Sequence, residues 1–241
     1  MGLGSSFGIS AETGNNIQTD GLIFYVDAAY KKSYPGSGTV VNDLAGTSIG
    51  TITNATFDSS GYFDFDGTND SISFTVPANA PTGDEARTIC SWIQMGHETN
   101  RMQAFGYGAG TSYRTFSMEI SSYGATDKSL GLHAWDLIWE STTLLTLDTW
   151  HYCTIAYAGG TVNTSNLKLY IDGKDAGLNR AYGSDNVTLN TPAENFKFGE
   201  RSSGSDLDYN GLLSTIHFYN KQLSAAEVLQ NYNAQKERFG L

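Results

Sequence analysis

The sequence of 241 residues is poor in cysteine and in positive charge, and each shortage excludes a class of protein. It contains two cysteines, Cys90 and Cys153, which excludes a small scaffold held by several disulfides. Both lie in apolar, strand-like segments, so we expect reduced core residues, with a single bridge between them as the alternative. Lys and Arg number 14 against 25 Asp and Glu, and the formal net charge of −11 would repel a phosphate backbone. Nucleic acid is therefore not an expected partner.

Long apolar runs and the common catalytic motifs are also missing. Without a run of about 18 apolar residues the sequence predicts no membrane span. The first residues, MGLGSSFGISAETGNN, lack the basic and apolar regions of a secretory signal, so we expect a soluble protein made without standard export. The four histidines form no i, i+4 pair and no cluster with cysteine, which argues against zinc. A nucleophile elbow, a phosphate loop and a dinucleotide fingerprint are absent as well.

What the sequence does contain is a series of short alternating segments. The 27 Gly, 14 Tyr and 12 Phe favour strands and turns over helices. Apolar and polar residues alternate in LIFYVDA, YFDF and SISFTV, as expected of strands with one buried face. Further strand-like segments lie at 88–95, 114–121, 129–135, 150–158, 166–173, 195–200 and 211–220. About a dozen short strands separated by turns predict one all-β domain, a two-sheet antiparallel sandwich or jelly roll.

The C-terminal segment 223–239 departs from this pattern and predicts a short helix. Ser224 is followed three residues later by Glu227, which forms a capping box at a helix start. A helix docked on the sandwich is the expected role, and a partner-binding helix is the alternative. The apolar residues that recur at helical spacing are Val228, Leu229 and Tyr232.

Residues 1–20 form a separate N-terminal arm, ahead of a domain at 21–241. The arm is rich in Gly, Ser, Asn and Thr, and its apolar anchors are Phe7, Ile9 and Ile17. These are too few to build a core. We expect the arm to be a flexible leader or to become ordered against another chain, where it would act as the assembly element.

The segment FDGTND, residues 65–70, crowds oxygen ligands into a turn. An EF-hand is excluded, because a loop starting at Asp64 places Asn69 where glycine is required. Asp64 and Asp66 share one face of a strand, as a catalytic pair would, but neither has an obvious desolvated partner. A hairpin turn is the favoured interpretation. Calcium held by Asp66, Asn69 or Asp70 is the alternative, and no other cofactor is expected.

Several longer segments together resemble the laminin-G-like, concanavalin A-like jelly-roll domain. They are DGLIFYVDAAYKKSYPGSGTVVNDLAG, FDFDGTNDSISF, RTICSWIQM, WHYCTIAYAGG, LKLYIDGK and LLSTIHFYNKQLSAAEVLQNYNAQKERFGL. The resemblance covers about residues 20–241 and implies a two-sheet sandwich. Many relatives carry two motifs that in some of them lie near a calcium, and here the first keeps Asp43 and Gly46 while the second has Ser214 and Thr215 in place of acids. Calcium is thus less expected than in a typical relative.

Enzymes share this fold, but their signatures are not found. The Glu-x-Asp-x-x-Glu spacing of retaining glucanases does not occur. A lyase would need His, Tyr and Arg together, and the segment 96–113 offers only scattered candidates. We therefore expect no catalysis. Trp135, Asp136 and Trp139, with the loop 99–113, are the candidates for a glycan site, and packing of both tryptophans in the core is the alternative.

The ends of the sequence are similar to copies of this domain in virion structural proteins of tailed bacteriophages, especially marine ones. The resemblance implies a non-enzymatic subunit at the virion surface, either a head decoration or a tail adhesin or fibre. Its partners would be other virion proteins, identical copies of itself and possible cell-surface glycans. A stand-alone glycan-binding module is the alternative, followed by a sandwich-fold glycosidase or lyase.

Overall fold

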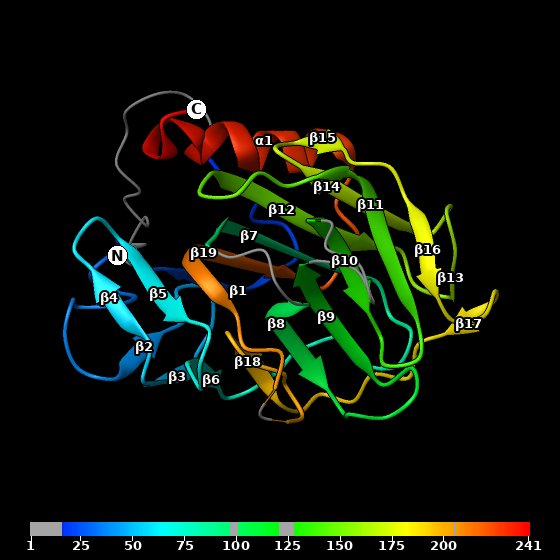
Figure 1. The fold of residues 1–241 in the computed structure, drawn as a ribbon, viewed down its shortest axis with the longest axis horizontal. Helices are drawn as coiled ribbons and strands as arrows, with labels where there is room; N and C mark the ends of the chain where they lie inside the picture. The colour runs from blue at the N-terminus through cyan, green and yellow to red at the C-terminus, as the bar shows by residue number, and fades with distance from the viewer. Residues whose placement is uncertain (1–15, 97–100, 121–127, 205) are drawn as a thin grey trace, which may run out of the picture.

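The computed structural model describes residues 16–96, 101–120, 128–204 and 206–241, which form two facing antiparallel sheets (Figure 1). One sheet has the order β15 (Lys174–Asp175), β14 (Leu167–Ile171), β12 (Trp150–Tyr157), β7 (Arg87–Met95), β19 (Asn210–Tyr219), β5 (Tyr62–Asp66) and β4 (Thr56–Asp58), with β1 (Leu22–Asp27) also on β19. We call it the eight-stranded sheet. The all-β sandwich predicted from the alternating segments is confirmed.

The facing sheet has nine strands in the described residues and is called the nine-stranded sheet below. Its order is β16 (Asn179–Tyr182), β11 (Ile138–Leu144), β10 (Ser129–His133), β9 (Thr115–Ile120), β8 (Met102–Gly108), β18 (Phe196–Phe198), β6 (Ser71–Phe74), β3 (Ile49–Thr53) and β2 (Val40–Asn42). Two further strands, β13 (Thr161–Val162) and β17 (Val187–Thr188), pair with each other.

Aromatic rings from both sheets fill the space between them. Phe24 of β1 is fully buried and meets Phe74 and Phe196 edge to face, with ring centroids 5.0 and 4.9 Å apart. Phe105 and Phe198 lie 5.2 Å apart in the same cluster. Edge-to-face aromatic pairs add to the stabilisation from burial itself. Because successive side chains of a strand point to opposite faces, these inward positions recur at every second residue of the sequence.

The predicted segments leave out several strands of the nine-stranded sheet, among them β8 and β11. Met102–Gly108 lies in a Gly-rich segment expected to be a loop, and Ile138–Leu144 was expected to belong to a loop leaving β10. Every residue of β8 is buried, so the strand shows no polar face and no alternation. Such a strand carries little sequence signal.

The hairpin prediction for FDGTND is wrong, although the turn itself is present. β5 pairs with β4 and β19, whereas β6 pairs with β3 and β18, so the segment crosses from one sheet to the other. Gly67 and Asn69 take positive φ, and Asp70 Oδ2 accepts from the Asp66 backbone N–H at 2.8 Å. Alternation identified both strands correctly but says nothing about which strands they pair with.

The predicted C-terminal helix is α1 (Ala225–Gln235), continued by the 3₁₀ turn η1 (Lys236–Phe239), and its capping box at Ser224 and Glu227 is present. Figure 1 shows it lying along β12 and β14, with the nine-stranded sheet on the opposite side. Val228 is fully buried there, but Leu229 is 43% exposed, so its predicted packing is wrong. Asn231 takes the buried position and donates to the Tyr219 hydroxyl at 2.9 Å. In the described residues, no helix has the length and apolar character needed to cross a membrane.

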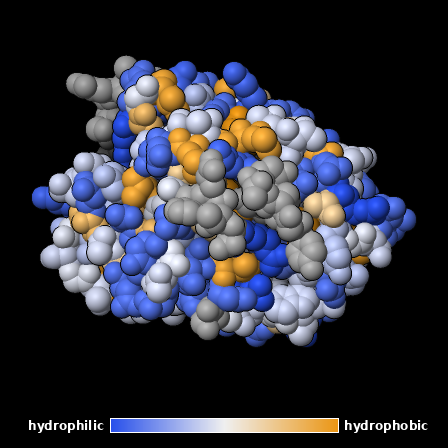
Figure 2. All heavy atoms as spheres, viewed as in Figure 1, coloured by the Kyte–Doolittle hydropathy of each residue, from blue (hydrophilic) through white to orange (hydrophobic). Residues whose placement is uncertain are grey.

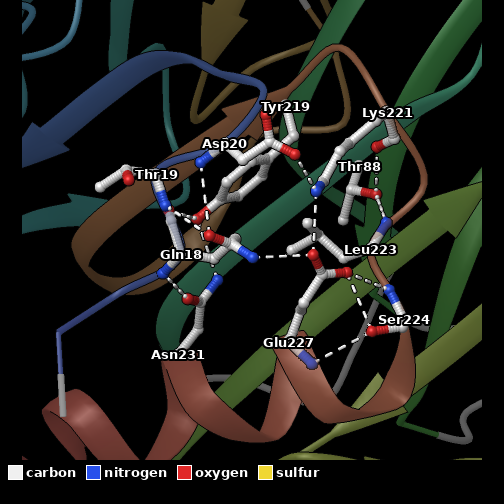
Figure 3. A network of polar contacts seen from close by, with 10 residues as sticks. All are labelled: Gln18, Thr19, Asp20, Thr88, Tyr219, Lys221, Leu223, Ser224, Glu227 and Asn231. Carbon is white, nitrogen blue, oxygen red and sulfur yellow. Dashed lines mark hydrogen bonds and ion pairs between the residues drawn. The ribbon is translucent and has the colours of Figure 1, made fainter.

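Residues 16–20 pack on the helix of their own chain (Figure 3). The Gln18 backbone N–H donates to Asn231 Oδ1 at 2.6 Å, and Gln18 Nε2 donates to Glu227 Oε1 at 2.7 Å. Ile17 is buried within the molecule, which differs from its predicted use as an anchor on a neighbour. Phe7 and Ile9 lie outside the described residues. Attachment through the arm stays a prediction.

Both cysteines are free and buried, as predicted. Cys90 packs with Trp92 and Val228 in the layer beneath the helix, whereas Cys153 belongs to the core between the sheets. The two thiols therefore lie on opposite faces of the eight-stranded sheet, which excludes the alternative of a bridge between them.

Candidate functional site

A hollow of about 180 Å³ lies over the outer face of the nine-stranded sheet, beside the turn that joins β10 to β11. Figure 2 shows a largely hydrophilic surface in which apolar residues form small separate patches. The residues that line the hollow are Arg101, His133, Trp135, Asp136, Ile138, Tyr182 and Arg201.

The β10–β11 turn presents Trp135 in an unusual backbone conformation. Its φ is 66°, in the left-handed region that a bulky residue rarely adopts. The turn is closed by the Ala134 backbone N–H, which donates to the Leu137 carbonyl at 2.8 Å. Arg201 stacks on the indole, with its guanidinium carbon 4.8 Å from the ring centre. The Trp135 indole is thus positioned by the conformation of the turn and by the Arg201 guanidinium on one of its faces.

Three loops around the hollow share this backbone strain. Most positive-φ residues other than glycine in the described chain are Asn or Asp, which tolerate that region. The bulky exceptions are Tyr113, Trp135 and Leu207. The first two loops are joined by Ser112, whose hydroxyl donates to Asp136. Strain of this kind persists where the surroundings enforce it, and it is concentrated at ligand sites.

Charged side chains beneath and beside Trp135 form a group of three, Glu119 with Arg101 and His133, and a separate pair, Arg201 with Asp206. Glu119 is only 2% exposed and lies between Arg101, at 3.0 Å from Nε, and His133, at 2.7 Å from Nδ1. Arg201 Nε lies 2.9 Å from Asp206 Oδ1. The hollow therefore combines guanidinium donors and the Asp136 carboxylate with aromatic surface from Trp135 and Tyr182. Directional polar groups beside an aromatic ring suit a polyhydroxylated ring such as a sugar.

The structure brings together part of the predicted glycan site. Trp135 and Asp136 line the hollow, with Arg101 and Ser112 from the segment 99–113 beside them. Trp139 is separated from it, because it is 7% exposed and packs in the core between the sheets, as the alternative interpretation held. Sequence reasoning did not assign His133, Tyr182 and Arg201 to a ligand site. They come from three distant elements, and no local motif connects them.

The weak metal candidates lie elsewhere, and hydrogen bonds already use their oxygens. Asp66 Oδ1 accepts from the Thr68 backbone N–H at 2.8 Å, Asp70 Oδ2 binds the Asp66 N–H, and Asn69 Oδ1 accepts from Asn54. Burial raises the pKa of Asp70, and the neighbouring carboxylates of Asp66, Asp64 and Asp208 add to this effect. Within the described ranges, no three His, Cys, Asp or Glu side chains are placed to hold a metal ion.

Asp43, retained from the family motif, closes its own loop. Its Oδ1 accepts from the backbone N–H groups of Tyr25 at 3.0 Å and Ala45 at 2.9 Å. This is the local capping that an aspartate provides in a turn. Calcium binding stays a prediction for this chain.

A family model described as the concanavalin A-like lectin/glucanases superfamily matches residues 66–229. Domain 4 of an extracellular arabinanase from Geobacillus stearothermophilus, solved with arabinotriose, is similar with a TM-score of 0.61 and 14% identity over 88% of this chain and 98% of that one. No curated protein sequence matches the chain.

Two larger proteins share the fold over part of their length. Trypanosoma rangeli sialidase matches with a TM-score of 0.58 and 15% identity, over 92% of this chain and 34% of the sialidase. The receptor-binding domain of botulinum neurotoxin D matches with a TM-score of 0.53 and 15% identity, over 90% and 53%. The chain thus spans about a third of the sialidase, and at these identities the likeness concerns the fold alone.

Proposed function

The chain belongs to the concanavalin A-like lectin/glucanase superfamily, and from that premise we propose that it is a non-catalytic carbohydrate-binding module whose site is the hollow at Trp135. The observation that carries the proposal is the strained β10–β11 turn, which presents an aromatic ring beside two guanidinium groups and a carboxylate. The similar arabinanase domain, solved with arabinotriose, supports this class of ligand.

The chemistry of the lining accounts for sugar binding. The exposed part of the Trp135 indole offers apolar surface to the C–H face of a sugar ring. Arg101 and Arg201 supply donors for hydroxyl oxygens, and Asp136 supplies an acceptor for hydroxyl protons. Each arginine lies close to a carboxylate through Nε, Arg101 to Glu119 at 3.0 Å and Arg201 to Asp206 at 2.9 Å, which limits where its guanidinium can move before a ligand arrives.

The same residues argue against glycoside hydrolysis at this site. In most glycosidase families, hydrolysis uses two carboxyl groups that flank the bond, one of them able to donate a proton. Among the described residues that line the hollow, Asp136 is the one carboxylate. Glu119 lies behind the lining and is engaged by Arg101 and His133. A binding role therefore fits these contacts better than a catalytic one.

Replacing the indole tests the proposal. On an array of neutral and acidic oligosaccharides that includes arabinotriose, the full chain is expected to retain at least one glycan. Trp135→Ala is expected to weaken that binding about tenfold, since an aromatic contact contributes about 1–1.5 kcal/mol. Tyr30→Ala is the matched control, because Tyr30 is an exposed aromatic residue outside the hollow. Equal loss with both variants, or unchanged binding by Trp135→Ala, would contradict this site.

A place on a virion surface stays a prediction, because the matches described above are to glycosidases and a toxin domain. In that setting the same module would act as the part of an adhesin or decoration that contacts cell-surface glycans. Identical copies on a particle would then strengthen weak single contacts through avidity.

A further inference from the structure

Three described histidines have different hydrogen-bonding requirements. Burial lowers the pKa of His217 to about 3, so this ring is neutral. His151 Nδ1 lies 2.8 Å from Asp172 Oδ2, and its Nε2 accepts from the Thr146 backbone N–H at 3.0 Å. One ring nitrogen of His151 must donate and the other must accept. A neutral imidazole satisfies both contacts.

His133 faces two acceptors instead. Its Nδ1 lies 2.7 Å from Glu119 Oε1, and its Nε2 lies 2.8 Å from the Trp135 carbonyl oxygen. Glu119 also lies close to Arg101, with Oε2 3.0 Å from Arg101 Nε. A neutral ring has a single N–H and would leave one lone pair facing an oxygen. An imidazolium donates to both.

The second of these contacts reaches the strained residue of the hollow. The carbonyl that His133 Nε2 faces belongs to Trp135, which holds φ at 66°. A bulky residue keeps that conformation only if its surroundings enforce it. The His133 contact is therefore one of the interactions that can set the position of the indole.

We propose that His133 is a positioning residue that, as an imidazolium, joins Glu119 to the Trp135 carbonyl and holds the indole for a sugar, so that binding weakens as the pH rises and the ring loses a proton. The part of this inference that concerns binding rests on the function proposed above. Among the described residues, the charged and titratable groups around the ring are Glu119 from β9, Arg101 ahead of β8, and Asp136, Tyr182 and Arg201 across the hollow.

The direction of the pH effect follows from these contacts. Nδ1 of the ring lies 2.7 Å from Glu119 Oε1, and Nε2 lies 2.8 Å from the Trp135 carbonyl oxygen, so two protons are needed for both contacts to be hydrogen bonds. When the ring gives up one proton, a single N–H remains. If that N–H remains hydrogen-bonded to Glu119, the Nε2 lone pair faces the Trp135 carbonyl oxygen. The hydrogen bond from His133 to the turn is then lost.

The first experiment needs no ligand. In the full chain with ¹⁵N-labelled imidazoles, both ring nitrogens of His133 are expected to be protonated at about pH 5 and one to be lost by about pH 9. His133→Gln assigns the His133 signals, and Trp135→Phe assigns the Trp135 indole signal. The indole resonance is expected to shift in the same pH step as His133. A neutral His133 throughout, or an indole that does not respond, overturns the proposal.

The second experiment measures binding. The oligosaccharide array is read with the full chain at about pH 5.5 and about pH 8.5, and retention is expected to be about tenfold tighter at the lower pH. His133→Gln, with no titrating ring, is expected to abolish the difference. His151→Gln is the matched control and is expected to keep it, because that ring needs no second proton.

The possible outcomes separate the two ideas. Glycan binding that is equal at both pH values overturns the role of His133 and leaves the binding module standing. If glycans bind at neither pH while the ring and indole titrate together, the proposed function fails and the link from His133 to Trp135 stands. Should His133→Gln fail to fold, judged by its melting curve, the wild-type titration and the His151→Gln control still decide.

Discussion

At the scale of single residues, Arg87 at the start of β7 shows how a buried charged group is satisfied by its neighbours. Its side chain is fully buried, with Nε donating to the Glu85 carbonyl at 2.8 Å and Nη2 donating to the Gly83 carbonyl at 2.9 Å. Nη1 donates to the Tyr107 hydroxyl. Aromatic rings also surround the guanidinium, at 5.4 to 5.9 Å from its carbon: Phe116, Tyr107 and Tyr157. The fork geometry of arginine matches several acceptors at once.

Arg87→Lys is therefore expected to destabilise the fold despite keeping the charge. A lysine cannot reach the carbonyls and the hydroxyl together, and each buried acceptor left without a donor costs about 1–3 kcal/mol. We expect a loss of about 2–3 kcal/mol in the free energy of unfolding, measured with urea. Arg180→Lys is the control, since Arg180 pairs with an exposed Asp185 and should change stability by less than about 1 kcal/mol. A similar effect for both variants would mean that the buried hydrogen bonds contribute little.

At the scale of elements, the sequence predicts where individual helices and strands lie, but it does not predict which strands pair with each other. The helix start at Ser224 and Glu227 follows from two residues three positions apart, and the structure confirms it. The pairing of β5 and β6 could not be read in the same way, because each strand takes partners from distant parts of the chain. The site has the same character. Trp135 and Asp136 are adjacent and were found, whereas Arg201 reaches them only through the fold.

The helix cap gives a pH prediction. Burial acts to raise the pKa of Glu227, but hydrogen bonds from Lys221, Ser224 and Gln18 prevail and lower it to about 2. A carboxyl group with a depressed pKa stabilises the fold above its unfolded value, about 4.3, and loses that contribution as the pH falls toward 2.

Glu227→Gln should therefore lower the stability by about 1–2 kcal/mol at pH 7 and have a smaller effect near pH 2, since the carboxylate is then being protonated in the wild type as well. Urea denaturation at both pH values measures this. Glu237→Gln, a change on the 3₁₀ turn that follows α1, is the control. An equal cost for Glu227→Gln at pH 7 and pH 2 would show that its charge is not what stabilises the cap.

At the scale of the whole molecule, two layers of apolar packing hold the fold, one between the sheets and one beneath the helix. In the second layer, Trp92 stacks on Phe239 with ring centroids 4.0 Å apart, and Arg238 donates to Asp27 Oδ1 at 2.8 Å. Stability is thus supplied by side chains from both ends of the sequence. The turn at Asp66 and Asp70 is closed by its own hydrogen bonds, so we expect this turn to keep its shape without an ion.

Chelation should accordingly leave the melting temperature of the full chain within about a degree, whereas loss of a saturating ion would cost several kcal/mol. Scanning calorimetry with EDTA, and then with added calcium, measures the shift. A large fall that calcium reverses would identify Asp66, Asn69 and Asp70 as ligands after all.

The docking of residues 16–20 and α1 on the outer face of the eight-stranded sheet has a consequence for display. The hollow at Trp135 lies over the outer face of the other sheet. An attachment made at Asn16 and the residues docked on α1 would therefore hold the module by the face opposite the hollow. With a glycan bound at the hollow, as proposed above, such an attachment would leave the binding face turned away from whatever holds the module.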